Sequence, residues 1–200
     1  GGQTPAQSFT PPGIAGYTPP TPLAFNIKRA RELLAEAGYP GGEGFPPFTL
    51  IFNTSESHRA IAEVVQQMWK KGLGIDIELR NQEWKVFLST MHEMDYQVAR
   101  SSWIGDYMYP DNFLTMWRTG EGNNETGWSN PQYDQLVTDS LSEANSDKRL
   151  EMLNEAEGIF LEEMPIIPIY YYTRTYRIDS RVKGWNPKLL DNRNLKYISF

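Results

Sequence analysis

The sequence predicts an α/β fold with a mixed, mainly parallel sheet flanked by helices. Three stretches with the pattern of strands begin near Phe48, Ile75 and Tyr96, and a helix-like segment lies in each gap between them. Strands joined through helices pair in parallel, because the crossover brings the chain back to the same end of the sheet. Their carboxyl ends then meet at one edge, where open α/β sheets collect ligands.

Composition narrows the class of protein. The 200 residues are enough for one good-sized domain, and 40 % hydrophobic content argues against disorder. The net charge is −6 and no basic cluster exceeds Lys70-Lys71, so we expect no nucleic-acid partner. Cysteine is absent, which excludes disulfides, thiol nucleophiles and thiolate metal sites.

No targeting or membrane segment is recognisable. No run approaches about 18 apolar residues, the length that indicates a membrane-spanning helix. The start, Gly1-Gly-Gln-Thr-Pro, has neither the basic residues nor the apolar core of a signal peptide. We expect that any targeting signal was removed or lies outside this sequence.

Three segments are expected along the chain. Residues 1–25 hold six prolines and no helical periodicity, which indicates an extended surface segment or lobe connector, with a disordered tail as the alternative. Residues 26–184 form the α/β lobe. Residues 185–200 form a returning C-terminal segment that ends in a strand.

The elements of the first half follow from caps and periodicity. Asn26 caps a helix that Gly38 ends, with Ala30, Leu33, Leu34 and Ala37 on one face. The cluster Gly41-Gly-Glu-Gly44 is a turn and not a phosphate loop, because the strand Phe48–Phe52 follows it and no helix does. A second helix starts at Thr54 or Ser55 and ends at Gly72. Its expected inward residues are Ile61, Val64, Val65, Met68 and Trp69.

The sheet and a helical region follow. Ile75, Ile77 and Leu79 alternate in the second strand, a helix runs from Trp84 to about His92, and the third strand is Tyr96–Ser101. Asp111–Arg118 is a helical turn. Two helices come next, one after Asn130-Pro131 and one from Ser146 to Pro165 with Leu150, Leu153, Ile159 and Phe160 inward. Pro168 makes 166–172 an edge or irregular strand, and 175–178 is also rich in β-formers.

Polar and aromatic residues follow each predicted strand. They are Asn53, Thr54 and His58; Gln82, Glu83 and Trp84; and Trp103, Gly105, Asp106 and Tyr107. The set offers a carboxylate for an amine, a histidine near a helix N-terminus for an anion, and indole faces for apolar groups. Arg100, inside the third strand, is a second candidate for an anion. A carboxylate beside aromatic walls suits a cationic ligand with an organic body.

Each of these residues also has a purely structural interpretation. Trp84 and Trp103 could each be a core residue and not the wall of a ligand site. Asp106 precedes a Pro-Asp turn and could stabilise a loop, and Arg100 could pair with Glu83 or Asp95. His58 could be a solvated surface residue.

Motifs for catalysis are missing. His58 and His92 are the only histidines, they stand 34 residues apart, and no His-Glu-x-x-His motif or Gly-x-Ser-x-Gly elbow is present. We therefore expect no metal, no cofactor and no enzyme activity. Asn53-Thr-Ser and Asn124-Glu-Thr match the glycosylation pattern, which has meaning only in a eukaryotic secretory protein.

Several segments together resemble the oligopeptide-binding proteins that serve bacterial peptide ABC transporters. The resemblance is carried by Asn81-Gln-Glu-Trp-Lys-Val-Phe-Leu88 and Gln97-Val-Ala-Arg-Ser-Ser-Trp-Ile-Gly-Asp106. It continues through Tyr39-Pro-Gly-Gly, Phe52-Asn-Thr-Ser-Glu-Ser-His58, Met68-Trp-Lys-Lys, Asn123-Asn-Glu-Thr-Gly-Trp-Ser-Asn-Pro-Gln-Tyr-Asp134, Pro165-Ile-Ile-Pro-Ile-Tyr-Tyr-Tyr172 and Val182-Lys-Gly-Trp185 through Leu190-Asp191. It spans essentially the whole chain, in the order that the family has.

The resemblance implies roles for particular residues. Family members are longer and close two lobes over a peptide, and this chain resembles only the C-terminal lobe with its returning segment, so the N-terminal lobe is missing. Asp106 matches the carboxylate that pairs with the peptide's α-ammonium, while the backbone of Ile104 and its neighbours Trp103 and Gly105 offers strand-like hydrogen bonds. The remaining matches are Arg100 and His58 for the peptide carboxylate, Trp84 for a pocket wall, His92 for a pocket position, and Met91 where some relatives carry arginine.

The function that this implies is binding of peptides between two lobes and delivery to the permease subunits of an ABC importer. The expected localisation of the protein is periplasmic or extracytoplasmic, either with or without a lipid anchor at the cell surface. The lobe itself is expected to be monomeric. An oligosaccharide-binding protein is the first alternative, because the chain holds six Trp and eleven Tyr. A hydrolase using Asp106 or Glu83 with His58 is a remote one.

Overall fold

A computed structural model describes residues 2–21, 24–173, 175–185 and 195–200. The chain divides into two compact units, one of residues Ala24–Ser102 and one that combines Gly1–Leu23 with Trp103–Phe200. The structure thus has a boundary after Ser102, inside the span that the sequence analysis treats as one lobe. The three segments expected from the sequence, 1–25, 26–184 and 185–200, stay a prediction.

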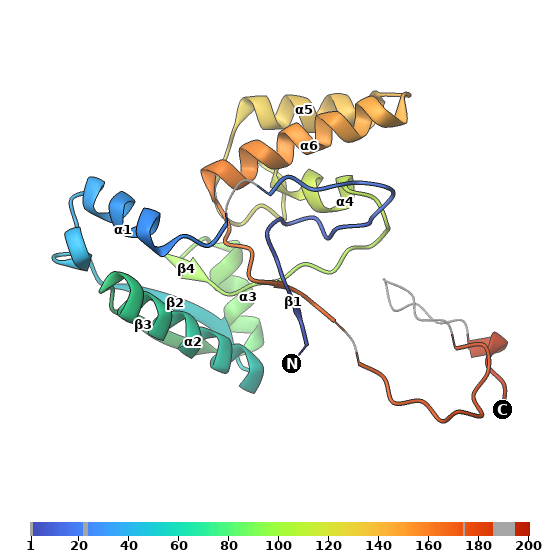
Figure 1. Ribbon diagram of the computed structural model, residues 1–200, viewed down its shortest axis with the longest axis horizontal. Helices are drawn as coiled ribbons and strands as arrows, with labels where there is room; N and C mark the ends of the chain where they lie inside the picture. Colours follow the sequence, from blue (N-terminus) through green and yellow to red (C-terminus); the bar gives the residue numbers. More distant parts are fainter. Residues whose placement is uncertain (1, 22–23, 174, 186–194) are drawn as a thin grey trace. The chain divides into compact units, whose positions relative to one another are not determined.

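The unit of residues 24–102 contains the predicted parallel sheet (Figure 1). Its elements are α1 (Ile27–Glu36), η1 (Pro40–Gly42), β2 (Phe48–Asn53), α2 (Glu56–Leu73), β3 (Ile77–Gln82), α3 (Trp84–His92) and β4 (Val98–Ala99). The strand order is β3-β2-β4, and β2 pairs in parallel with both neighbours. The α/β prediction is confirmed, although β4 is shorter than the predicted strand 96–101.

The alternation of β2 places a hydrophobic layer on each face of the sheet. Leu50 and Phe52 pack in one cluster with Ala62 of α2, and the intervening Ile51 packs on the other face with Phe87 and Met91 of α3. Successive side chains of a strand point to opposite faces of the sheet. Since α2 packs on one face and α3 on the other, the central strand β2 is covered on both sides.

The predicted inner face of α2 is partly wrong. Val64 and Met68 are 58 % and 52 % exposed, while the small Ala62 is buried at 1 %. In α1, Leu33 is likewise half exposed. The apolar stripe of each helix is wider than the surface that its neighbours cover. Periodicity alone predicts the stripe and not which part of it is in contact.

Local signals fix the ends of α1 and α2. The Asn26 side chain accepts a hydrogen bond from the Arg29 N–H at 3.0 Å, as an N-cap does. Gly74 ends α2 with φ 73°, two residues beyond the predicted end, and its backbone packs closely against the backbone of Gly41 and Gly42. A Cβ at Gly42 or Gly74 would overlap that neighbouring backbone, so this contact requires glycine.

The second unit is built mainly on a helix pair. Its elements are β1 (Thr4–Pro5), α4 (Asp111–Leu114), η2 (Thr115–Trp117), α5 (Pro131–Ser142), α6 (Ser146–Glu163), β5 (Tyr170–Tyr171) and η3 (Leu195–Tyr197). Helices α5 and α6 lie side by side, and β1 pairs antiparallel with β5 (Figure 1). Tyr133 of α5 and Leu153 and Phe160 of α6 are fully buried between them and the α4 region.

The N-terminal segment is part of this core. Its described residues 2–21 include no helix, and Ile14 and Tyr17 of this segment are buried. Glu157 of α6 holds it: its carboxylate accepts from the backbone N–H of Phe9 at 2.9 Å and of Thr10 at 2.8 Å, and from the Tyr17 hydroxyl at 2.7 Å.

The remaining predictions concern loops and the C-terminus. The described residues 175–178 form no strand, and the expected final strand is reduced to a bridge between Lys183 and Ser199. Residues 186–194 of the predicted returning segment lie outside the described ranges.

Asn124 is 6 % exposed and its Nδ2 donates to three backbone carbonyls, so it is not an accessible glycosylation acceptor. No helix in the described part of the chain could cross a bilayer.

Candidate functional site

The carboxyl edge of the three-stranded sheet is tied together by polar contacts. Thr54, just after β2, donates its N–H to the Gln82 carbonyl at the end of β3 at 2.9 Å and its hydroxyl to Asn81 Oδ1 at 2.9 Å. Asn53 is hydrogen-bonded to His58 Nδ1 at 2.8 Å. The strand ends and the first turn of α2 therefore form one framework, as the parallel arrangement predicts.

His58 and Arg100 are electrostatically coupled at this edge. Partial burial and the positive charge of Arg100 lower the pKa of His58, and the contact with Asn53 offsets only part of this. The imidazole is then largely neutral at pH 7, so it serves as a hydrogen-bond group beside the permanent charge of Arg100. The Arg100 backbone N–H is fixed on the Ile51 carbonyl at 2.9 Å. The pair is suited to an anionic group.

Trp84 provides an aromatic surface on the first turn of α3. Its side chain is 53 % exposed and stacks on Phe87 with ring centroids 6.0 Å apart. Glu83 caps the helix by accepting from the Lys85 N–H at 2.8 Å. The exposed indole face is available for an apolar group, and the Glu83 carboxylate already has a structural task.

Met91 and His92, at the end of α3, differ in accessibility. Met91 is 6 % exposed and packs with Ile51 and Phe87 in the core. Its side chain offers a ligand almost no surface, so we leave it out of the proposed site. His92, in contrast, is exposed.

The segment Trp103–Asp106 belongs to the other compact unit. Trp103 is half buried against that unit's core, whereas Ile104 is 67 % exposed. The Asp106 N–H donates to the Asn112 side chain at 2.9 Å. The exposed Asp106 carboxylate has no hydrogen-bond or ion-pair partner within the described ranges. It is a carboxylate on a fixed backbone, open to a cation.

Two polar residues that shape this unit, Asn112 and Glu157, were not predicted from the sequence. Asn112 stands in a short helical turn and has no motif that would single it out. Glu157 carried a usable signal, because it falls four residues after Leu153 and three before Phe160, on the inner face of α6. A carboxylate in that register indicates a buried polar contact.

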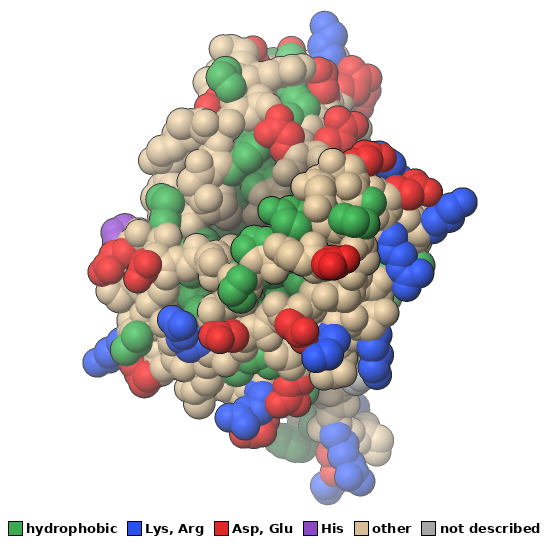
Figure 2. Space-filling view, turned by 90° about the vertical axis from the view of Figure 1, so that its left-hand side faces the viewer, with side chains coloured by type: hydrophobic (Ala, Val, Ile, Leu, Met, Phe, Trp, Pro, Cys, Tyr) green, Lys and Arg blue, Asp and Glu red, His purple; other side chains and the backbone are tan. Residues whose placement is uncertain are grey.

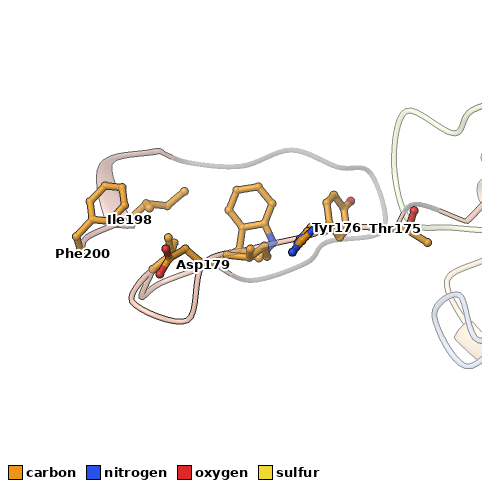
Figure 3. Close-up of a pocket in the computed structure, with 9 residues that line it drawn as sticks. Thr175, Tyr176, Asp179, Ile198 and Phe200 are labelled. Atoms are coloured by element: carbon orange, nitrogen blue, oxygen red, sulfur yellow. The ribbon is translucent and has the colours of Figure 1, made fainter.

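The structure also has a cavity of about 460 Å³ in the C-terminal region (Figure 3). Among its lining residues are Thr175, Tyr176, Asp179, Ile198 and Phe200. None of the residues that the sequence analysis proposed for the site lines it.

Surface charge and metal-binding groups do not identify a further site. On the face drawn in Figure 2, acidic and basic side chains are interspersed. In the part of the chain that the structure describes, no three His, Asp or Glu side chains group closely enough to hold a metal ion.

The sequence was also compared with known proteins. Residues 1–125 match the sequence profile described as bacterial extracellular solute-binding proteins, family 5 middle. The chain belongs to this family. It is 42 % identical over 192 residues to the oligopeptide-binding protein OppA of Bacillus subtilis, covering 92 % of this chain and 35 % of that protein. It is 38 % identical to the periplasmic murein peptide-binding protein MppA of Escherichia coli, covering 98 % of this chain and 38 % of MppA.

The fold is also similar to solved structures of peptide-binding proteins. A periplasmic oligopeptide-binding protein of Borrelia burgdorferi aligns with a TM-score of 0.88 and 35 % identity, over 99 % of this chain and 40 % of that one. Haemophilus influenzae OppA in complex with the peptide RPPGFSPFR aligns with a TM-score of 0.87 and 30 % identity, over 98 % and 40 % of the two chains. The chain thus spans well under half the length of these family members.

Proposed function

We propose that this chain is the C-terminal lobe of a peptide-binding protein that delivers peptides to an ABC importer. The observation that carries the proposal is the Asp106 carboxylate, exposed and unpaired within the described ranges, on a loop whose backbone Asn112 holds. A carboxylate in that state is a suitable partner for an α-ammonium group. Two relatives with peptide-binding names, at 42 % and 38 % identity, support the same ligand class.

The other proposed contacts follow the chemistry of a peptide. Arg100 with His58 and exposed His92 suit carboxylates, Trp84 suits an apolar side chain, and the backbone of Trp103, Ile104 and Gly105 suits main-chain hydrogen bonds. Main-chain contacts are shared by all peptides, so they give affinity without demanding a particular sequence. The protein would act outside the cytoplasm with permease subunits as partners, and would do no chemistry on its ligand. The proposal includes a lipid anchor at the cell surface as one form of attachment.

Calorimetric titration of the complete gene product tests the ligand class. Unmodified peptides of two to five residues should bind, and N-acetylated peptides of the same sequence should bind more weakly. Oligosaccharides are the competing arm, because exposed Trp84 could also stack on a sugar ring. Saturable binding of an oligosaccharide, with no binding of any peptide in the panel, would overturn the proposal. Recovery of cleaved peptide after incubation would overturn the non-enzymatic part.

A further inference from the structure

The backbone that carries Asp106 is fixed by residues that lie outside the candidate site. The Asp106 N–H donates to Asn112 Oδ1 at 2.9 Å, and Asn112 is only 6 % exposed. A side chain buried to this degree has little rotamer freedom. The hydrogen bond therefore ties the loop to α4 at the one residue whose carboxylate the proposed function uses.

Gly105 adds a steric contact to the same anchor. A Cβ at this position would lie 2.8 Å from Phe113 Cζ and 2.9 Å from Asn112 Oδ1. Both distances are shorter than ordinary carbon contacts, so the loop approaches α4 more closely than any other residue would allow. Gly105 does not have a positive φ, so its role here is to give space and not an unusual backbone conformation.

Helix α4 is itself anchored, which makes it a rigid base. Asp111 pairs with Arg149 of α6 at 2.7 Å, and its side chain is 7 % exposed. The Arg149 guanidinium also lies 4.5 Å from the centre of the Tyr109 ring. The Tyr133 hydroxyl of α5 donates to the Leu114 carbonyl at 2.6 Å. Contacts to both long helices therefore hold the turn that presents Asn112.

We infer that Asn112 is a positioning residue for the ammonium-binding carboxylate, with Gly105 providing the close approach that its hydrogen bond needs. This inference rests on the proposed function. Asn112 is not itself one of the proposed ligand contacts. It sets where Asp106 stands, and so sets how strongly the protein prefers a peptide with a free amino terminus over a blocked one. A charge pair depends steeply on distance in a desolvated site, so a small displacement of the loop is enough to reduce this preference.

The test compares Asn112→Leu with Asn124→Leu in the complete gene product. Leucine fills a similar volume and accepts no hydrogen bond. Asn124 is a matched control, because it lies in the same unit, is also 6 % exposed, and also binds loop backbone, at Trp117 and Trp128. Each variant is titrated with one peptide in its free and its N-acetylated form.

We expect Asn112→Leu to lower the preference for the free amine about three- to tenfold, the range that corresponds to one lost hydrogen bond. Asn124→Leu should lower thermal stability and leave that preference within about twofold, the difference of a few tenths of a kcal/mol. Gly105→Ala, which pushes the loop from α4 by a different route, should act in the same direction as Asn112→Leu. An unchanged preference in both Asn112→Leu and Gly105→Ala would overturn the inference.

A second measurement needs no ligand. Hydrogen–deuterium exchange at the Asp106 amide should be slow in the parent, faster in Asn112→Leu and unchanged in Asn124→Leu. Fast exchange in the parent would show that the anchor does not exist, whatever the protein binds. If the parent binds no peptide but this exchange pattern holds, the proposed function fails and the loop anchor stands as a structural finding only.

Discussion

Glu157 shows how one buried residue joins distant parts of the chain. It is 0 % exposed, and its three hydrogen bonds reach across about 140 residues to the N-terminal segment. The sequence places it on the inner face of α6, yet nothing in the sequence tells which backbone amides it meets. A contact between residues so far apart depends on the fold as a whole.

The buried carboxyl of Glu157 should make stability depend on pH. Burial raises the pKa of Glu157 above its ordinary value, although the hydrogen bonds from Thr10, Phe9 and Tyr17 work against this. The folded state then holds the proton more tightly than the unfolded chain, so stability falls as pH rises from about 4.5 through the raised pKa. Glu157→Gln should flatten this dependence in urea unfolding.

Glu151→Gln is the control, because Glu151 is an exposed glutamate on the same helix. It should leave the pH dependence of the parent unchanged. Equal slopes for the parent and Glu157→Gln would mean that Glu157 does not change its proton affinity on folding.

At the scale of elements, the sequence predicts the type of each long element and the buried residues Leu153 and Phe160 of α6, but it misplaces part of the covered face of α2. Helices α2, α3, α5 and α6 begin within two residues of the predicted positions, because caps such as Asn130 and the apolar period are local signals. Local sequence does not determine the exposure of Val64 and Met68 or the burial of Met91. They depend on where a neighbouring element ends, which a single sequence does not state.

The buried face of α3 gives a direct test. Met91→Ala should destabilise the protein by about 2 to 3 kcal/mol, because the lost thioether leaves a cavity beside Ile51 and Phe87. Leu88→Ala, on the same helix but 44 % exposed, should change stability by less than about 1 kcal/mol. The measurement is the free energy of unfolding in urea. Similar losses in the two variants would contradict the burial described for α3.

At the scale of the molecule, the chain consists of two units built in different ways. Residues 24–102 are continuous and have a hydrophobic cluster on each face of their sheet. The other unit combines two separate segments through the β1–β5 pairing and Glu157. Of the residues proposed to contact a ligand, Trp84, His58 and Arg100 lie in the first unit, and Asp106 with its loop lies in the second. The sequence patterns gave no sign of this division, and the roles of these residues stay a prediction.

The continuous unit should fold by itself. Expressed alone, residues 24–102 should show a cooperative thermal transition and dispersed amide signals in NMR spectra, because both faces of the central strand β2 are covered within the segment. The segment Trp103–Phe200 without residues 1–23 should melt less cooperatively, since it lacks the partners of Glu157. A non-cooperative melt of residues 24–102 would contradict its description as a compact unit.

The central claim is that Asp106 binds the amino terminus of a peptide, and a double cycle measures it most directly. The complete gene product and its Asp106→Asn variant are each titrated with a free and an N-acetylated form of one peptide. In the proposed function a second lobe closes over the peptide and buries this charge pair. Losing one member of a buried charge pair costs about 2 to 5 kcal/mol, so either change alone should weaken binding roughly 30-fold or more. Because both changes remove the same pair, combining them should add little further loss. Equal binding of both peptides by the parent and by Asp106→Asn would contradict the claim and leave Asp106 as an ordinary loop residue.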